Sequence, residues 1–228
     1  MNILILMAGK GQRFHGSEYS DPKPFIKIDG EYMFLKSVKN IEIEGAKFIF
    51  VTLKEYAKRY NLSQNGNFIY LDEVLNGPLL SALSAKHLIN NDDELIICNS
   101  DQELVWDKKD FIATSRKYDG SVVIKKESGP RWSFAQIEDG LVINIEEKKE
   151  ISDMALCGIH YFKKGADFIK YAEQAIADNC KANGEYYVAP IYNYAIKDGL
   201  KVYGYQISEM NDFGTPDALG YFLTKNKS

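Results

Sequence analysis

Short apolar runs alternate with amphipathic segments in the amino-terminal half of the chain. Four of the runs have the length and composition of buried strands, and they are Asn2–Met7, Lys47–Leu53, Asn67–Leu71 and Glu94–Asn99. Between them, apolar positions recur with helical spacing in Phe34–Ile43, Glu55–Tyr60 and Pro78–Ile89. Strands that alternate with helices predict a mostly parallel sheet with right-handed crossover connections.

Beyond Asp101 the pattern changes to shorter strand-like runs without long helices between them. These runs are Ser121–Lys126, Trp132–Ile137, Leu141–Ile145 and Ala155–Phe162. The dipeptide Asp139-Gly140 is typical of a tight hairpin turn, so we expect antiparallel additions to the sheet. The remaining expected elements are helices at about Gly165–Asn179 and Glu185–Ile196, a strand at Leu200–Ile207 and a last helix from near Pro216.

Length and composition suit one α/β domain that covers residues 1–228. The chain has 228 residues, of which 45% are hydrophobic and 26% are charged, and no repeat, low-complexity tract or linker divides it. The apolar runs are too short to span a bilayer. The first residues lack the basic segment and cleavage site of a signal peptide. We therefore expect a cytoplasmic protein that does not bind membranes.

Charge, cysteine and histidine content narrow the classes of function. The net charge of -4 argues against general nucleic-acid binding. Between Met7 and Ile28, however, basic residues outnumber acidic ones, with Lys10, Arg13, Lys23 and Lys27 against Glu18 and Asp21, which favours a small anionic ligand. The widely spaced cysteines and histidines form no zinc, disulfide or metal-binding pattern, and we expect structural roles for them: Cys98, Cys157, Cys180, His15, His87 and His160.

The first strand breaks into a loop that contains Gly9, Lys10, Gly11 and Arg13. The loop is neither a Walker sequence nor a complete GxGxxG fingerprint, because Phe14 stands where the third glycine would be. Its place after a strand is nevertheless the place where ligands bind in open α/β sheets. Glycines let backbone N–H groups converge on an anion, and an arginine can hold phosphate oxygens with two hydrogen bonds.

Three further charged residues complete a candidate site. Lys23 lies between Pro22 and Pro24, which we expect to hold it in a stiff, extended segment. Asp101 follows an apolar strand, and Asp212 lies between a strand and a helix. Either carboxylate alone would also suit a turn or a helix cap. At neighbouring strand ends, the two would form a Mg²⁺ site that faces a triphosphate.

Five motifs, in order along the chain, give it a resemblance to the sugar-phosphate nucleotidyltransferases. "LMAGKGQRF" resembles the glycine loop of that family, which usually reads close to LAGGxGxRL, and "PKPFIKIDG" resembles its PKP segment. "LNGPLLSAL" is similar to the segment beside the base and ribose, and "IEEKK" to the strand with a Glu-Lys pair that meets the acceptor. "DFGTPDAL" resembles a turn near the carboxyl end of the family, so the resemblance extends from Asn2 to Leu219.

The resemblance implies a Rossmann-like α/β fold of the glycosyltransferase-A type, with a mixed sheet flanked by helices. It also implies Mg²⁺-dependent nucleotidyl transfer with release of pyrophosphate. Arg13 and Lys23 would be catalytic, and Asp101 and Asp212 would bind Mg²⁺. The nucleotide would be bound within about residues 1–115, by Met7, Ala8, Gly9, Lys10, Gly11 and Gly77. The acceptor would be bound within about residues 116–228, by Trp132, Ser133, Glu147 and Lys148.

Departures from the family pattern leave the substrates open. Lys10 replaces the usual second glycine, and Trp132 with Ser133 stands where the family often has Tyr-Gly. The acceptor could therefore be a sugar 1-phosphate or a non-sugar phosphate such as phosphoglutamine. Tyr186 and Tyr187 could line its pocket or belong to the core. The size of the chain resembles that of shorter cytidylyl- and guanylyltransferases of bacterial capsule and surface-glycan synthesis, which weakly favours CTP.

Other classes of protein share parts of the pattern. A glycosyltransferase of the same fold would use a DxD metal motif, whereas this chain has "NSDQE". A molybdopterin guanylyltransferase would have a lysine sooner after the arginine. A non-catalytic nucleotide-binding module would not need Lys23, Asp101 and Asp212 together. None of these comparisons decides the oligomeric state, and an oligomer remains compatible with the sequence.

Overall fold

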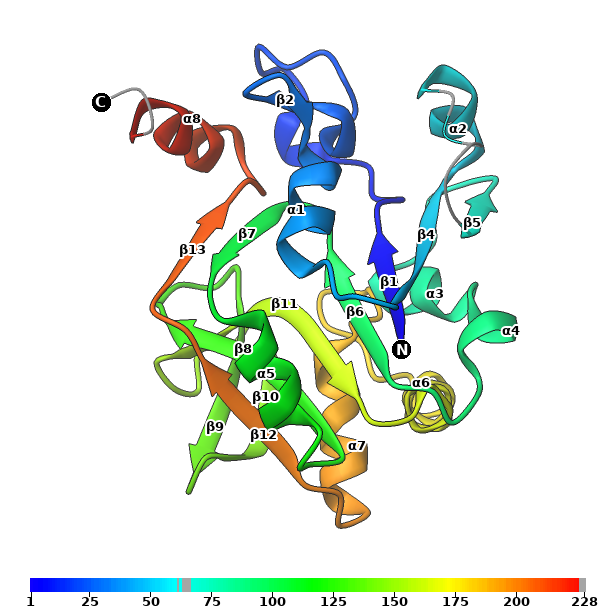
Figure 1. The fold of residues 1–228 in the computed structure, drawn as a ribbon, viewed down its shortest axis with the longest axis vertical. Coiled ribbons are helices and arrows are strands. Elements are labelled where there is room, and N and C mark those ends of the chain that lie inside the picture. The colour runs from blue at the N-terminus through cyan, green and yellow to red at the C-terminus, as the bar shows by residue number, and fades with distance from the viewer. Residues whose placement is uncertain (61, 63–66, 226–228) are drawn as a thin grey trace.

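A nine-stranded mixed sheet runs through the centre of the molecule (Figure 1). The computed structural model describes residues 1–60, 62 and 67–225. The strand order is β5-β4-β1-β6-β11-β8-β12-β10-β9. The first four strands are parallel, as the sequence predicts, and they are β5 (Asn67–Leu71), β4 (Lys47–Leu53), β1 (Asn2–Leu6) and β6 (Leu95–Asn99).

The second half of the sheet contains the predicted antiparallel additions. Strand β11 (Met154–Phe162) is antiparallel to β6 and to β8 (Gly120–Lys126). Strand β12 (Val202–Gln206) runs parallel to β8. The hairpin predicted at Asp139-Gly140 joins β9 (Ser133–Glu138) to β10 (Leu141–Glu147), and both turn residues have positive φ, of 49° and 80°.

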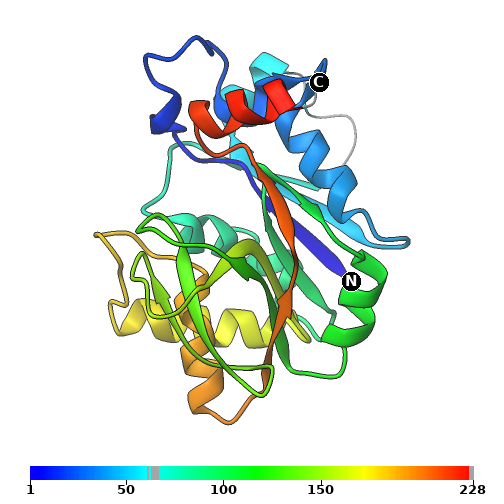
Figure 2. The same ribbon diagram turned by 90° about the vertical axis from the view of Figure 1, so that its left-hand side faces the viewer.

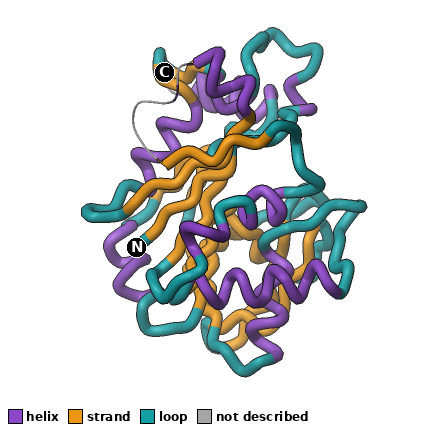
Figure 3. The backbone as a smooth tube through the Cα atoms, turned by 90° about the vertical axis from the view of Figure 1, so that its right-hand side faces the viewer, coloured by secondary structure: helices purple, strands orange, loops and turns teal. Residues whose placement is uncertain are grey.

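Helices cover both faces of the sheet (Figures 2 and 3). Helices α1 (Met33–Ile41) and α5 (Lys108–Ser115) lie on one face. Helices α3 (Pro78–Leu83), α6 (Gly165–Ala177) and α7 (Tyr192–Lys197) lie on the other. Helix α2 (Lys54–Tyr60) contacts β4 and β5, and α4 (Lys86–Ile89) contacts α6. Among the described residues, no helix is both long enough and apolar enough to span a membrane.

Two expected helices differ from the structure, and for the second one tertiary hydrogen bonds override the local pattern. The helix expected at Pro78–Ile89 ends after Leu83 and restarts at Lys86. The helix expected at Glu185–Ile196 begins only at Ala189, with a short 3-10 helix to Ile191 that leads into α7. The segment before it, residues 184–188, is a non-helical strap. Within it Tyr186 N–H donates to the Asn76 carbonyl (3.1 Å), and the Tyr186 carbonyl accepts from Leu79 N–H (3.1 Å).

A two-stranded ribbon and the last helix complete the fold. Strand β13 (Glu209–Asp212) is antiparallel to β7 (Gln102–Val105), in a register that pairs Asp212 with Gln102. Helix α8 (Pro216–Lys225) follows and lies beside the amino-terminal loop segment (Figure 2). There it shares a separate apolar cluster with the short β2–β3 hairpin (Lys27–Ile28 and Glu31–Tyr32), formed by Phe14, Ile26, Ile28, Met33, Phe213, Leu219 and Phe222.

Two helical glycines provide a matched test of the packing. A Cβ at Gly165, at the start of α6, would lie 1.9 Å from the Ile89 carbonyl oxygen, whereas a Cβ at Gly220 in α8 would meet nothing within 4 Å. We expect Gly165→Ala to lower the free energy of unfolding by about 1–3 kcal/mol, because backbone must move. Gly220→Ala should raise it by about 0.5–1 kcal/mol through helix propensity. Urea unfolding of both variants measures this, and equal effects would contradict the packing at Gly165.

Candidate active site

Two adjoining cavities open at the carboxyl ends of β1 and β6. The larger, of about 550 Å³, is lined by the glycine loop, Lys23 and Gly77. The smaller, of about 230 Å³, is lined by residues of β6, β10 and β11, by the ribbon and by the strap. Both cavities share Leu6, Arg13, Pro78, Asn99, Asp101 and Gly214. The 14 residues predicted for the site all line one or both, namely Met7, Ala8, Gly9, Lys10, Gly11, Arg13, Lys23, Gly77, Asp101, Trp132, Ser133, Glu147, Lys148 and Asp212.

The glycine loop packs closely against the segment that contains Lys23. Gly11 has φ of 60°, and a Cβ there would lie 3.1 Å from the Cβ of Lys23. The prediction of an extended conformation for Lys23 is wrong, because Lys23–Phe25 forms one turn of 3-10 helix. Phe25 N–H donates to the Pro22 carbonyl (2.8 Å), and Pro24, which has no N–H, leaves that turn intact. Lys23 is therefore held rigidly beside the loop.

Gly77 joins the segment that lines the larger cavity to the strap. Its φ is 107°, a conformation that favours glycine. A Cβ at this position would lie 2.3 Å from the Tyr186 carbonyl oxygen. The two hydrogen bonds between Asn76–Leu79 and Tyr186 therefore require glycine at position 77. They fix the strap against this wall of the larger cavity.

The two predicted metal-binding carboxylates come together, but by a different route from the one expected. Asp101 follows β6, and Asp212 ends β13, which is not a neighbour of β6 in the main sheet. The β7–β13 ribbon brings them together, and Phe213 N–H donates to the Asp101 carbonyl (2.9 Å). A Cβ at Gly214 would lie 2.9 Å from Asp212 Oδ1 and 3.1 Å from Asp101 Oδ2. Both carboxylates therefore face the same small space beside a glycine.

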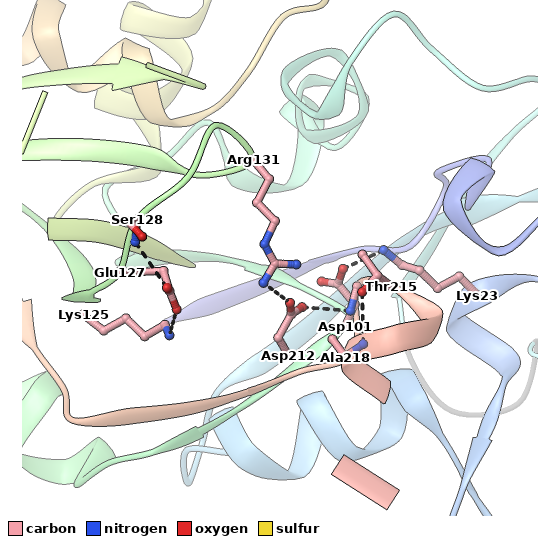
Figure 4. A network of polar contacts seen from close by, with 10 residues as sticks. Lys23, Asp101, Lys125, Glu127, Ser128, Arg131, Asp212, Thr215 and Ala218 are labelled. Carbon is pink, nitrogen blue, oxygen red and sulfur yellow. Dashed lines mark hydrogen bonds and ion pairs between the residues drawn. The ribbon is translucent and has the colours of Figure 1, made fainter. Parts of the chain in front are cut away.

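Cations already neutralise both carboxylates (Figure 4). Lys23 Nζ donates to Asp101 Oδ2 at 2.6 Å. Arg131 Nη2 lies 2.7 Å from Asp212 Oδ2, without the alignment of a hydrogen bond. Asp212 Oδ1 accepts from Gly214 N–H at 2.8 Å. The buried Oδ2 of Asp212 thus keeps unused capacity as an acceptor.

The carboxylates of Asp101 and Asp212 suit a Mg²⁺ ion that is bound partly by the protein and partly by substrate phosphates. Mg²⁺ in proteins is often bound by one or two carboxylates, with water and substrate phosphates at its other coordination positions. The missing side chain at Gly214 leaves room for such an ion between Asp101 and Asp212. Within residues 1–60, 62 and 67–225, no group of 3 or more His, Cys, Asp or Glu side chains forms a fuller metal cage. The protein contribution to such a site would therefore be Asp101 and Asp212.

The residues predicted to bind the acceptor make two sets of polar contacts in the smaller cavity. Ser133 donates a short hydrogen bond to Glu147, and Lys148 donates one to the Tyr187 hydroxyl. Tyr187 in turn donates to Glu185 Oε2 (2.7 Å). Lys148 has φ of 58°, and its N–H donates to the Trp132 carbonyl (2.9 Å). This irregular backbone turns the Lys148 side chain toward the strap.

The structure also separates the two tyrosines of the strap. Tyr187 lines the smaller cavity, which is one of the two roles left open by the sequence. Tyr186 packs against the main hydrophobic core, and its hydroxyl donates to Asn179 Oδ1 (3.0 Å). The two alternatives left open by the sequence therefore apply to one tyrosine each.

The smaller cavity is also lined by residues that sequence analysis did not assign to the site, among them the polar side chains of Asn99, Gln102, Arg131 and His160. A signal for His160 was present, because Leu156, Gly158 and His160 lie at alternate positions of one strand and so share a face. A glycine inside a strand also marks a close approach, and Gly158 has φ of 65°. Nothing local in the sequence indicates the contact between Arg131 and Asp212.

Comparison with known proteins agrees with the resemblance seen in the sequence motifs. No family model matches the sequence. The chain is 27% identical over 241 residues to the bifunctional protein GlmU of Methanocaldococcus jannaschii, and 28% identical over 237 residues to that of Methanococcus maripaludis strain C5. Each alignment covers 99% of this chain and 55% of the relative, so the chain spans about half the length of these curated relatives.

Solved structures align over nearly the whole chain. A nucleoside-diphosphate-sugar pyrophosphorylase from Vibrio cholerae RC9 superposes with a TM-score of 0.83 and 25% identity, covering 98% of this chain and 100% of the other. In sequence and in fold the chain is therefore similar to the sugar-phosphate nucleotidyltransferases. An inositol-1-phosphate CTP transferase from T. maritima shares the fold, with a TM-score of 0.74 at 15% identity, over 98% of this chain and 94% of its own.

The buried Glu147 gives a pH-dependent prediction. Burial raises the pKa of its carboxyl, outweighing the Ser133 hydrogen bond and Lys148, which lower it. A raised pKa in the folded state means that the ionised form lowers stability once the pH exceeds the unfolded-state value, about 4.3. We expect Glu147→Gln to increase the free energy of unfolding, by an amount that vanishes in acid, grows between the unfolded-state and the folded-state pKa, and is constant at higher pH. Urea unfolding across pH measures this, and a pH-independent difference would contradict it.

Proposed function

We propose that this protein transfers a nucleotidyl group from a nucleoside triphosphate to a phosphorylated acceptor, such as a sugar 1-phosphate. The products are a nucleoside-diphosphate-activated compound and pyrophosphate. The observation that carries this proposal is the meeting of the two cavities at Arg13 and Asp101. A triphosphate in the larger cavity and an acceptor phosphate in the smaller one would then approach each other beside a pair of carboxylates.

The reaction is an in-line displacement at the α-phosphorus. An oxygen of the acceptor phosphate forms a bond to the α-phosphorus, the bond between that atom and the oxygen bridging to the β-phosphate breaks, and pyrophosphate leaves with the electron pair. The nucleophile is already an anion, so no general base is needed. The main barrier is the approach of two anions, which positioning and fixed positive charge relieve.

Residues of this chain supply most of that positive charge. The N–H groups of the glycine loop and the Arg13 guanidinium would hold the triphosphate, and Lys23 would stabilise charge on the leaving pyrophosphate. Lys148 and Arg131, from the opposite wall, would hold the acceptor phosphate. When bound by Asp101 and Asp212, Mg²⁺ would add a divalent charge beside the phosphates. Lys23 and Arg131 now contact these same carboxylates, so each would exchange a carboxylate for a phosphate during binding.

The finer assignments rest on the sequence resemblance. CTP as the triphosphate, a role in capsule or surface-glycan synthesis, and the division into a nucleotide half and an acceptor half remain predictions. The 55% coverage of the GlmU relatives means that their bifunctional description is not transferred whole to this chain.

Release of pyrophosphate tests the proposed function. The protein is mixed with Mg²⁺, each of the four common triphosphates and a panel of phosphorylated acceptors. We expect one triphosphate–acceptor pair to release pyrophosphate in the presence of both substrates. Asp101→Asn should remove most of this turnover, because an amide neutralises metal charge poorly. Tight triphosphate binding without turnover for any acceptor would favour a non-catalytic module, and full activity of Asp101→Asn would refute the metal assignment.

A lysine pair tests the acceptor side of the site. Lys148 lines the smaller cavity, whereas its neighbour Lys149 is exposed and lines neither cavity. A charge-assisted hydrogen bond contributes about 1.5–3 kcal/mol. Lys148→Ala should therefore lower kcat/KM for the acceptor roughly ten- to a hundredfold, while triphosphate binding measured by calorimetry stays nearly unchanged. Lys149→Ala is the matched control. Equal losses for both ligands, or for both variants, would refute the assignment.

A further inference from the structure

A small apolar cluster, separate from the main hydrophobic core, contains the immediate chain neighbours of two site residues. We call it the α8 cluster, and its buried members are Phe14, Ile26, Ile28, Met33, Phe213, Leu219 and Phe222. Phe14 directly follows Arg13 in the chain, and Phe213 directly follows Asp212. Packing in this cluster therefore bears on the positions of an arginine proposed to hold the triphosphate and of a carboxylate proposed to bind Mg²⁺.

Phe213 is fixed from two directions. Its N–H donates to the Asp101 carbonyl (2.9 Å). Its fully buried ring meets the ring of Phe222 edge to face, with centroids 5.0 Å apart and planes at 68°. Aromatic pairs of this geometry stabilise packing beyond the area that they bury. The Phe222 ring thus supports the backbone from which the Asp212 carboxylate reaches Gly214 N–H (2.8 Å).

Phe14 anchors the arginine side of the site in a similar way. Arg13 is exposed and lies in the middle of a single 3-10 turn, Gln12–Phe14. The hydrogen bond from Phe14 N–H to the Gly11 carbonyl (2.8 Å) closes that turn. The Phe14 side chain is buried in the α8 cluster. A three-residue turn has little stability of its own, so the buried ring of Phe14 anchors it.

Helix α8 supplies the ring of Phe222 and lies beside the amino-terminal loop segment (Figure 2). One side of the helix packs on the cluster and the other meets solvent, since Phe222 is 6% exposed and its neighbour Tyr221 is 70% exposed. On the buried side, Lys36 Nζ of α1 lies 5.8 Å from the centroid of the Phe222 ring. At the end of the helix, Lys225 Nζ lies 2.7 Å from Glu209 Oε1 of β13. The helix is therefore joined both to the cluster and to the strand that carries Asp212.

The small size of the α8 cluster makes it sensitive to the loss of one ring. Deleting a large side chain leaves a cavity that the few neighbouring side chains can reduce only by moving. Movement of Phe213 would displace Asp212, its chain neighbour. Movement of Phe14 would displace Arg13 in the same way. A displacement of about 1 Å can lower turnover about a hundredfold, even when the mutated residue is far from the reacting atoms.

We propose that Phe222 is a positioning residue for the nucleotidyl transfer. Through its ring contact with Phe213, it sets the place of Asp212. Through the α8 cluster, which it shares with Phe14, it sets the place of Arg13. Phe222 itself lines neither cavity. This inference rests on the proposed function and adds a support for the site that lies outside both cavities.

The kinetic test removes the ring. With the triphosphate and acceptor that wild type uses best, Phe222→Ala should lower kcat roughly ten- to a hundredfold, because two charged groups lose their placement. The Mg²⁺ concentration for half-maximal turnover should rise about tenfold, the usual loss when a residue that orients a metal ligand is removed. Phe222→Leu, which refills part of the cavity, should recover part of both losses. An unchanged Mg²⁺ dependence overturns the proposal, because a smaller folded fraction alone would lower turnover equally at every Mg²⁺ concentration.

Two alanine variants are the matched controls. Tyr221→Ala alters the exposed neighbour in the same helix, and Phe168→Ala deletes a fully buried ring of the main core. Both should keep the kcat and the Mg²⁺ dependence of wild type once corrected for the folded fraction. If Phe222→Ala does not fold, Phe222→Leu and Phe168→Leu make the same comparison with a smaller expected loss. Equal losses in the Phe222 and Phe168 variants overturn the proposal.

Hydrogen exchange follows the supported segments without turnover. The probes are the N–H groups of Phe213 and Phe14, which donate to the Asp101 and Gly11 carbonyls, and the amides of β6 are the reference. In Phe222→Ala the two probe amides should exchange about tenfold faster through local opening, while the β6 amides keep their wild-type rates. Unchanged exchange at Phe213 overturns the proposal.

A binding measurement separates failure of this inference from failure of the proposed function. If wild type releases no pyrophosphate with any substrate pair, the proposed function fails. The inference is then judged by hydrogen exchange and by calorimetry of the four common triphosphates with Mg²⁺. A Kd about tenfold higher for Phe222→Ala than for wild type and Phe168→Ala supports it. Equal Kd values, or no binding of any triphosphate to wild type, overturn it.

Discussion

The pairing of β7 with β13 is the constraint on which the rest of the site depends. Asp212 is 111 residues from Asp101 in the sequence, and it reaches Asp101 because residues 209–212 pair with residues 102–105. The same pairing sets Gln102 beside Asp212, and the hydrogen bond from Phe213 N–H to the Asp101 carbonyl locks the register. A shift of one residue would turn Asp212 to the other side of the ribbon. The carboxylates of Asp101 and Asp212 would then lie apart, and Asp212 would no longer line the smaller cavity.

Sequence patterns predict the parts of this molecule that local physics determines. The parallel strands, the hairpin at Asp139-Gly140 and the glycine loop follow from periodicity and turn chemistry. The β7–β13 ribbon does not, because four-residue strands carry little pattern and gain their stability from distant partners. The strap was expected to be helical because its composition suits a helix, but the backbone of Tyr186 is committed to Asn76 and Leu79. His160 shows the same limit, since periodicity gives its face but not the cavity that the face meets.

Charge neutralisation explains how so many ionised groups can share one cleft. Lys23 pairs with Asp101, and Arg131 pairs with Asp212. In the absence of a ligand, these pairs reduce the repulsion between like charges in the cleft. Substrate phosphates offer these cations alternative partners. The arrangement therefore keeps the site folded and charged, with the positive groups already close to the positions where phosphate oxygens would lie.

The contact between Gly77 and Tyr186 has a mechanical consequence. Two main-chain hydrogen bonds join segments that are 109 residues apart in the sequence, and the absence of a Cβ at Gly77 lets them approach without a gap. One of these segments borders the larger cavity, and the other carries Tyr187 into the smaller one. A displacement of either segment must move the other or break both bonds. The wall of the larger cavity and the strap beside the smaller one are therefore held at a fixed spacing, so that neither cavity can widen at this point on its own.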